Sequence, residues 1–125
     1  IHKKNIEKNV QNYVKFFYFS KECILILKKN VESMSNNLSI VNSSVKSFIK
    51  NSINKYQLIF YDPPFELDTE IVNEEILIIE NILNDQGLLI IHRHKSSEEI
   101  YFSKNYQLHR EKNYGQSKIL ILRRI

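Results

Sequence analysis

A carboxylate followed by two prolines and an aromatic residue is the stretch of this 125-residue chain best suited to chemistry. The four residues are Asp62, Pro63, Pro64 and Phe65. Proline fixes φ at about −65° and has no N–H, so this segment cannot form a helical turn and its carbonyl groups stay available as acceptors. A planar amino group has two donors, which the Asp62 carboxylate and the Pro63 carbonyl can accept together. Phe65 adds a face on which a nucleobase can stack.

The residues before this motif predict how it is positioned. The run 56–61 is mostly apolar and aromatic, which predicts a buried strand of a parallel sheet, and the prolines end that strand at Asp62. Ligands of open α/β sheets bind at the carboxyl ends of the strands, so Asp62 is expected at a ligand-binding edge. A structural interpretation is also open, in which the motif only ends the strand and Asp62 caps the next helix.

Apolar periodicity predicts alternating strands and helices over one domain, residues 1–125. Strands are expected at 13–19, 38–41, 56–61, 88–91, 106–110 and 118–122, and helices at 20–31, 44–52 and 68–83. The acidic residues of helix 68–83 are expected on its solvated face, and Gly87 is expected to supply the left-handed residue that follows the helix. This order predicts an α/β fold with a mostly parallel sheet and an antiparallel hairpin at its C-terminal end.

Composition narrows the classes of function. A hydrophobic content of 42% and a charged content of 26% are typical of globular chains, and no apolar run reaches the roughly 20 residues of a membrane span. The first residues do not resemble a signal peptide, and the single cysteine, Cys23, cannot form an intrachain disulfide. We therefore expect a cytoplasmic protein without a membrane partner.

Charge is segregated along the chain. Residues 1–55 contain ten Lys and three Glu, residues 62–85 contain eight acidic residues and no basic one, and residues 86–125 contain eight Lys or Arg and three Glu. The basic flanks favour a nucleic-acid partner. The lysine content also fits the drift of an AT-rich genome, so both interpretations stay open.

Two histidines follow the expected strand 88–91. His92 and His94 are alternate residues, so their side chains should point to the same side, which would permit metal binding. No third ligand lies nearby in the sequence, and we expect these residues and Arg93 to form a basic rim for the substrate, without a metal.

Together these motifs resemble the bacterial small-subunit ribosomal RNA guanine-N2 methyltransferases, which modify 16S ribosomal RNA with S-adenosylmethionine. The resemblance is carried by residues 27–30, 56–65, 87–95 and 114–118. It implies a Rossmann-like class I methyltransferase sheet and ribosomal RNA or the small ribosomal subunit as the partner. The site residues it implies are Asp62 and Pro63 for catalysis, and Pro64, Phe65, His92, Arg93, His94 and Tyr114 for substrate binding.

The chain departs from that family in its cofactor contacts. The family's glycine-rich loop is absent, its ribose-binding acid corresponds to Tyr18, and its adenine-binding acid corresponds to Ser44 or Ser43. We therefore expect a sheet without the family's first strand, in either the C-terminal part of a longer protein or a degenerate relative. Two functions remain open: S-adenosylmethionine-dependent methylation of a guanine amino group in small-subunit ribosomal RNA, or a non-catalytic RNA-binding or ribosome-assembly role.

Overall fold

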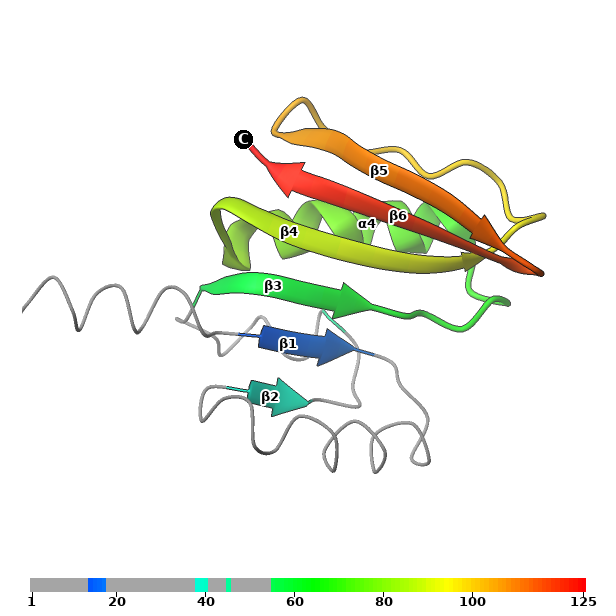
Figure 1. Ribbon diagram of the computed structural model, residues 1–125, viewed down its shortest axis with the longest axis horizontal. Coiled ribbons are helices and arrows are strands. Elements are labelled where there is room, and N and C mark those ends of the chain that lie inside the picture. Colours follow the sequence, from blue (N-terminus) through cyan, green and yellow to red (C-terminus); the bar gives the residue numbers. More distant parts are fainter. Residues whose placement is uncertain (1–13, 18–37, 41–44, 46–54) are drawn as a thin grey trace, which may run out of the picture.

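A six-stranded mixed sheet is the framework of the protein (Figure 1). The computed structural model describes residues 14–17, 38–40, 45 and 55–125. The strands, in the spatial order β2-β1-β3-β4-β6-β5, are β1 Val14–Phe17, β2 Leu38–Ile40, β3 Tyr56–Tyr61, β4 Leu83–His94, β5 Tyr106–Tyr114 and β6 Ser117–Arg124. Strands β2, β1, β3 and β4 are parallel, and β6 and β5 are antiparallel. The predicted fold class, a mostly parallel sheet that ends in an antiparallel hairpin, is therefore confirmed.

Strand β1 hydrogen-bonds directly to β3, with Val14 opposite Leu58 and Phe17 opposite Tyr61. No strand lies between these two in the described part of the chain. The expected helices 20–31 and 44–52 lie outside the described residues, apart from Val45 in the second.

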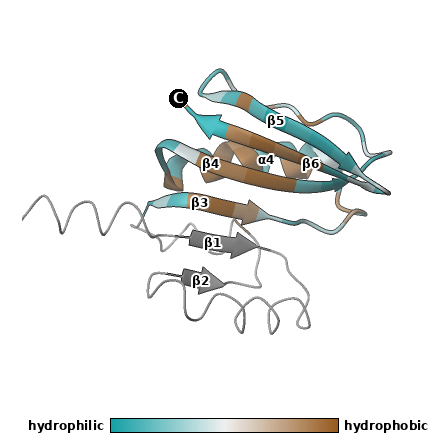
Figure 2. Cartoon of the chain, in the orientation of Figure 1, coloured by the Kyte–Doolittle hydropathy of each residue, from teal (hydrophilic) through white to brown (hydrophobic). Residues whose placement is uncertain are grey.

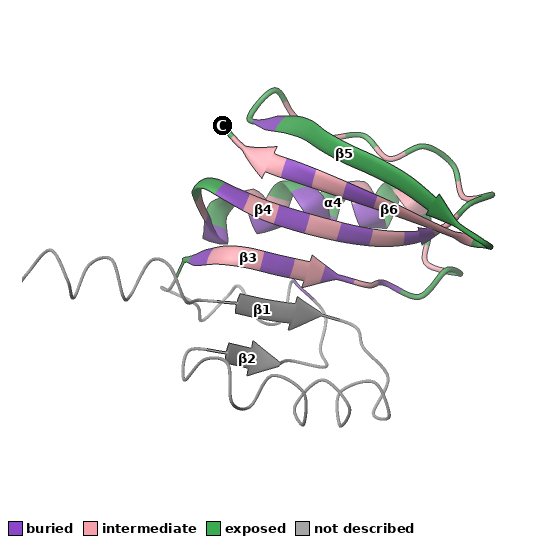
Figure 3. Cartoon of the chain, viewed as in Figure 1, coloured by how far each residue is buried: buried purple, intermediate pink, exposed green. Residues whose placement is uncertain are grey.

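Helix α4, Thr69–Ile79, covers one face of the sheet behind β4 and β6 (Figure 1). Apolar side chains of β3, β4 and β6 that point toward α4 form the core, as the alternating buried and half-buried residues of Figure 3 show. Figure 2 shows the same strands as the most hydrophobic part of the sheet. Fully buried members include Ile59, Ile76, Leu89, Ile91 and Leu122, each worth about 1.5–3 kcal/mol of transfer free energy. No described helix is long and apolar enough to span a membrane.

The connection from α4 to β4 differs from the prediction. The helix ends at Ile79, a 3₁₀ turn spans Glu80–Ile82, and β4 begins at Leu83. Strand β3 pairs Tyr56 with Leu83 and Leu58 with Leu88, so residues 84–87 bulge out of the ladder.

The left-handed residue of this bulge is Gln86, with φ of 65°, so the expectation that Gly87 supplies it is wrong. Gly87 is required for a different reason. A Cβ atom at this position would lie 2.8 Å from the carbonyl oxygen of Asn84 and 3.0 Å from the Leu83 side chain.

Glu75 is an exception to the solvated acidic face predicted for α4, because its side chain is buried. The Tyr61 hydroxyl donates to Glu75 Oε1 at 2.8 Å, and the Val45 N–H donates to Oε2 at 3.3 Å. A carboxylate tolerates burial when hydrogen bonds replace its water.

Candidate active site

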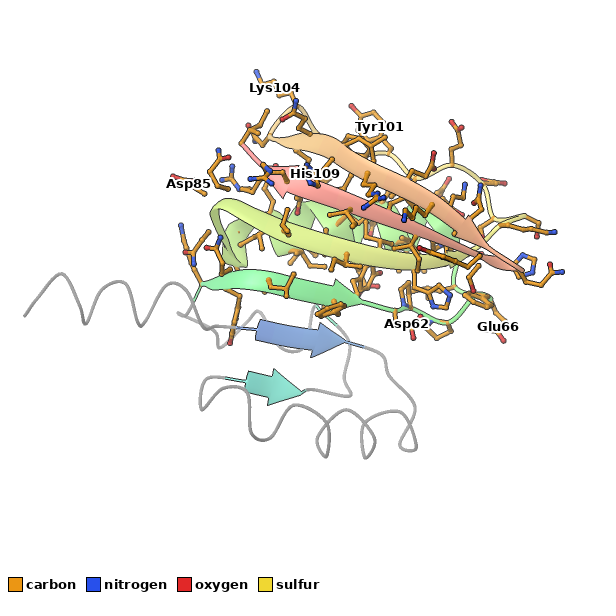
Figure 4. The ribbon with its side chains drawn as sticks, in the orientation of Figure 1. Asp62, Glu66, Asp85, Tyr101, Lys104 and His109 are labelled. Atoms are coloured by element: carbon orange, nitrogen blue, oxygen red, sulfur yellow. The ribbon has the colours of Figure 1, made fainter. Side chains whose placement is uncertain are left out.

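Asp62 lies where β3 ends, at the carboxyl edge of the parallel strands, as predicted (Figure 4). Because β3 pairs Tyr61 with Ile91, the next residue on each strand brings Asp62 beside His92. Asp62 Oδ1 is 2.8 Å from His92 Nδ1, and His92 Nε2 is 2.8 Å from Ser117 Oγ. Three side chains from β3, β4 and β6 thus form one hydrogen-bonded array.

Sequence reasoning missed Ser117 as a site residue. It is a diagonal neighbour of His92, since β4 pairs His92 with Ile119 and His94 with Ser117. The position of Ser117 next to His92 depends on the register of the β4–β6 ladder. In the sequence, the one local feature that pointed to Ser117 was the turn before it.

Asp62 and His92 are partly screened from water, with side-chain exposed fractions of 26% and 32%. Burial raises the pKa of Asp62 above its usual range, while the hydrogen bond and the charge of His92 lower it. The net direction is upward, so the carboxylate takes up a proton at a higher pH than an exposed aspartate does.

Phe65 stands beside this array and is 43% exposed. Its ring meets those of His92 and His94 edge to face, with centroid separations of 5.2 and 5.5 Å. Pro63 is buried and Pro64 is exposed, and the Pro64 carbonyl accepts the N–H of Leu67 at 3.0 Å. The motif is thus a tight loop that holds an aromatic ring at the surface next to Asp62.

The two histidines share one face of β4, as predicted, but only His92 contacts Asp62. His94 Nδ1 accepts the N–H of Ser96 at 3.1 Å and lies 2.7 Å from Ser96 Oγ. His94 is therefore held toward the loop after β4, where its ring makes the T-shaped contact with Phe65.

Arg93 points to the opposite face of β4 and is only 2% exposed. Its Nη1 and Nη2 atoms lie 3.5 Å from the Pro64 carbonyl oxygen and from Thr69 Oγ1, respectively. Burial lowers its pKa. Arg93 is therefore a support for the loop and not part of the exposed rim predicted with the histidines, because strand alternation turns its side chain toward α4.

Tyr114 is exposed at the end of β5, opposite Ser117, which is in turn opposite His94. The Lys112 ammonium lies 5.9 Å from the centre of the Tyr114 ring, within the range of a cation–π contact. Tyr114 thus lies on the same face and at the same edge as the histidines, two strands from β4.

A hollow of about 470 Å³ opens beside the proline loop on the side of α4. Its lining residues are Phe65, Glu66, Leu67, Asp68, Thr69, Glu70, Arg93, Ser97 and Glu98. Four acidic side chains on this rim disfavour the binding of a phosphate group in this hollow.

The predicted cofactor contacts Tyr18 and Ser44, with the neighbouring Ser43, lie outside the described residues. What the structure describes is therefore the substrate-facing part of the predicted site. Among the described residues, no three His, Cys, Asp or Glu side chains are grouped to hold a metal ion.

The order of strands and the strand-end carboxylate define the Rossmann-like methyltransferase fold. The chain belongs to the family described as Conserved hypothetical protein 95, whose profile matches residues 10–123. It is 33% identical over 78 residues to the Rickettsia prowazekii (strain Madrid E) protein described as uncharacterized methylase RP545, covering 62% of this chain and 33% of that protein.

Two solved structures extend this likeness. The Escherichia coli protein yhhF, assigned as a methyltransferase, superposes with a TM-score of 0.65 at 25% identity, over 90% of this chain and 64% of that one. SMU.776, also assigned as a methyltransferase and solved in complex with SAH, superposes with a TM-score of 0.68 at 11% identity, over 97% of this chain and 48% of that one. The chain thus spans less than two thirds of each of these proteins.

Proposed function

We propose that this protein methylates the exocyclic amino group of a nucleobase, with guanine N2 of small-subunit ribosomal RNA as the target and S-adenosylmethionine as the methyl donor. The observation that carries the proposal is the Asp62 carboxylate at the ligand-binding edge of the sheet, held by His92 and bordered by the exposed Phe65 ring. Membership of a family with methylase relatives and the SAH bound to SMU.776 support methyl transfer and this donor.

Asp62 has two tasks in this reaction. A carboxylate accepts an N–H of the amino group and fixes the direction of the nitrogen lone pair, and such orientation can supply about 7–11 kcal/mol of a reaction barrier. When bound, S-adenosylmethionine would supply an electrophilic methyl group, and the C–S bonding pair would stay on sulfur as the C–N bond forms. The nitrogen would then lose one proton, and we assign the Asp62 carboxylate as its acceptor.

Phe65 holds the base in the same proposal. Its exposed ring stands beside Asp62, so a base stacked on it would present its amino group toward the carboxylate. Stacking of this kind is worth about 1–3 kcal/mol per base.

The distribution of charge supports RNA as the substrate. Arg110 and Lys112 of β5 pair with Ile121 and Ile119 of β6, which place them on the face of the sheet that carries His92. Both side chains are exposed, as is most of β5 in Figure 3. Glu111 lies between them and points to the α4 face. A phosphate backbone would therefore contact basic side chains on the face of the sheet that carries Asp62, and acidic side chains on the face that α4 covers.

Asp62→Ala tests the proposal, because alanine removes both acceptor oxygens, whereas asparagine would keep one. We expect kcat to fall about 10²–10³-fold, the usual loss for one group that stabilises a transition state. Asp85→Ala is the matched control, since Asp85 is exposed at the far end of β4 (Figure 4). Transfer of labelled methyl groups to undermethylated small subunits and a thermal melt are measured together; Asp62→Ala activity within threefold of the parent refutes the assignment.

The pH dependence gives a second check on Asp62. Because its pKa is raised, the parent should lose activity as the pH falls through a value above the usual carboxylate range. An acidic limb at or below the value of an exposed aspartate would contradict the use of this carboxylate.

A non-catalytic RNA-binding role is the second candidate. It is favoured by Tyr18 and Ser44 at the positions where the resembled family has cofactor-binding acids. Calorimetric titration of the protein with S-adenosylmethionine separates the two functions: RNA binding without cofactor binding supports the second and contradicts the first.

A further inference from the structure

The hydrogen bonds of the Asp62 array have a direction that follows from their chemistry. An ionised carboxylate can only accept, so the 2.8 Å contact between Asp62 Oδ1 and His92 Nδ1 requires the proton to be on Nδ1. In a neutral imidazole the other nitrogen is then an acceptor, so the Ser117 hydroxyl donates to Nε2 across 2.8 Å. Both hydrogen bonds point from β6 toward Asp62.

We propose that Ser117 and His92 are positioning residues for Asp62. The Ser117 hydroxyl, by donating to Nε2, fixes the orientation of the His92 ring, and the Nδ1–H of this ring holds Oδ1 so that Oδ2 is presented to the amino group of the base. This role rests on the proposed methyl transfer. It extends that function by naming the two side chains that keep the Asp62 carboxylate in one orientation. Neither of these side chains needs to touch the base.

Among the described residues, His92 is the titratable side chain that hydrogen-bonds to Asp62. Arg93 and Lys118 lie on the other face of the sheet, where both border a separate hollow of about 190 Å³. His94 is on the same face, but its Nδ1 is engaged by Ser96. The contribution of His92 to the pKa of Asp62 is downward, against the effect of burial, as expected for a donor that favours the ionised form.

The connectivity matches that of Ser-His-Asp hydrolases, but the order of function is reversed. In a hydrolase the serine is the nucleophile and the aspartate is buried behind the histidine. Here Asp62 is at the ligand-binding edge beside Phe65, and Ser117 is the remote end, at the start of β6. The same pair of hydrogen bonds therefore orients a carboxylate instead of activating a hydroxyl.

The tautomer gives a test that does not depend on activity. Long-range ¹H–¹⁵N correlation spectra of the full-length protein at neutral pH should show His92 protonated at Nδ1. In Ser117→Ala the chemical shift of Nε2 should change, because this acceptor loses its hydrogen-bond donor, and Ser117→Thr should restore the parent spectrum because threonine keeps the hydroxyl.

Kinetics test the consequence. Ser117→Ala should lower kcat about tenfold, as the loss of an orienting partner does, and leave the KM for RNA unchanged. Ser117→Thr should recover most of the lost kcat. His92→Leu should lower kcat about 10²-fold and move its acidic limb to higher pH, because Asp62 loses the partner that lowers its pKa. His92→Asn should be more active than His92→Leu, since the asparagine amide can replace the Nδ1–H donor.

Three results would overturn the positioning role. They are His92 protonated at Nε2 alone in the parent, His92→Asn no more active than His92→Leu, and Ser117→Ala altering the melting temperature but not kcat. If the spectra show the Nδ1–H tautomer but the parent methylates no RNA, the proposed function fails and the positioning role with it, while the hydrogen-bonded array stands. The spectra and the parent's activity therefore distinguish the two failures.

Discussion

Replacement of Phe65 by leucine separates a base-stacking role from a packing role. The Phe65 side chain is 43% exposed and makes T-shaped contacts with two histidine rings outside the apolar core. Shortening a partly exposed side chain leaves no enclosed cavity, so its cost should stay below about 1.5 kcal/mol, less than that of a truncation in a core. We therefore expect Phe65→Leu to change the free energy of unfolding by less than this value.

The expected loss in RNA binding is larger. Stacking of one base on an aromatic ring is worth about 1–3 kcal/mol, which corresponds to about 5- to 150-fold in affinity. Phe65→Leu should weaken the binding of an RNA fragment that contains the target guanine by a factor in this range. Phe65→Tyr should stay within about threefold of the parent, because the ring is kept.

Fluorescence anisotropy with labelled RNA measures the affinity, and urea denaturation measures the stability of the same preparations. Tyr101→Leu is the matched control, since Tyr101 is an exposed aromatic residue in the loop before β5, away from Asp62 (Figure 4). Parental affinity in Phe65→Leu, or a loss of the 3–5 kcal/mol typical of a truncated buried ring, would refute the stacking role.

Three further predictions concern the bulge, the core and strand β5. Gln86→Gly should raise the free energy of unfolding by up to about 1 kcal/mol, because φ of 65° is unfavourable for a residue with a Cβ. Gly87→Ala should lower the free energy of unfolding by about 1–3 kcal/mol, because its Cβ would clash with the backbone. Urea denaturation measures both changes, and the reverse order would mean that Gly87 is the left-handed residue. Tyr106→Phe should cost about 1 kcal/mol in the same assay, because its buried hydroxyl donates to the Ile76 carbonyl at 2.9 Å, and no measurable cost would contradict that hydrogen bond. The double variant Arg110→Gln, Lys112→Gln should make the slope of log affinity against log salt concentration shallower by about 1.4, the value for two phosphate contacts to a single strand. An unchanged slope would mean that the RNA backbone is bound elsewhere.

Sequence reasoning succeeded where the signal was contiguous. The strand before Asp62, the proline loop, the apolar stripe of α4 and the terminal hairpin each follow from residues that are neighbours in the chain. The pairing of side chains between strands was less accessible. Ser117 reaches His92 only because β6 is placed beside β4 in one register, and no local pattern encodes that distance.

Charged side chains were harder to place than apolar ones. Glu75 was expected in solvent and Arg93 at the substrate, yet both are buried on the α4 side of the sheet. Each has partners remote in sequence: Glu75 accepts hydrogen bonds from Tyr61 and Val45, and the Nη atoms of Arg93 lie 3.5 Å from the Pro64 carbonyl and from Thr69. The Nε atom of Arg93 is buried without a hydrogen-bond partner among the described residues. A charge pattern predicts burial only when such partners are known.

The bulge at residues 84–87 connects these observations to the site. It sits at the start of β4, before the regular pairing with β3 begins at Leu88, and so it fixes which β4 residue stands beside Asp62. A slip of one residue would turn every β4 side chain to the opposite face and bring Arg93, not His92, next to the carboxylate. The bulge around Gln86 and Gly87, about 17–20 Å along the strand from the site, therefore determines that Asp62 meets an imidazole with a second hydrogen-bonding nitrogen.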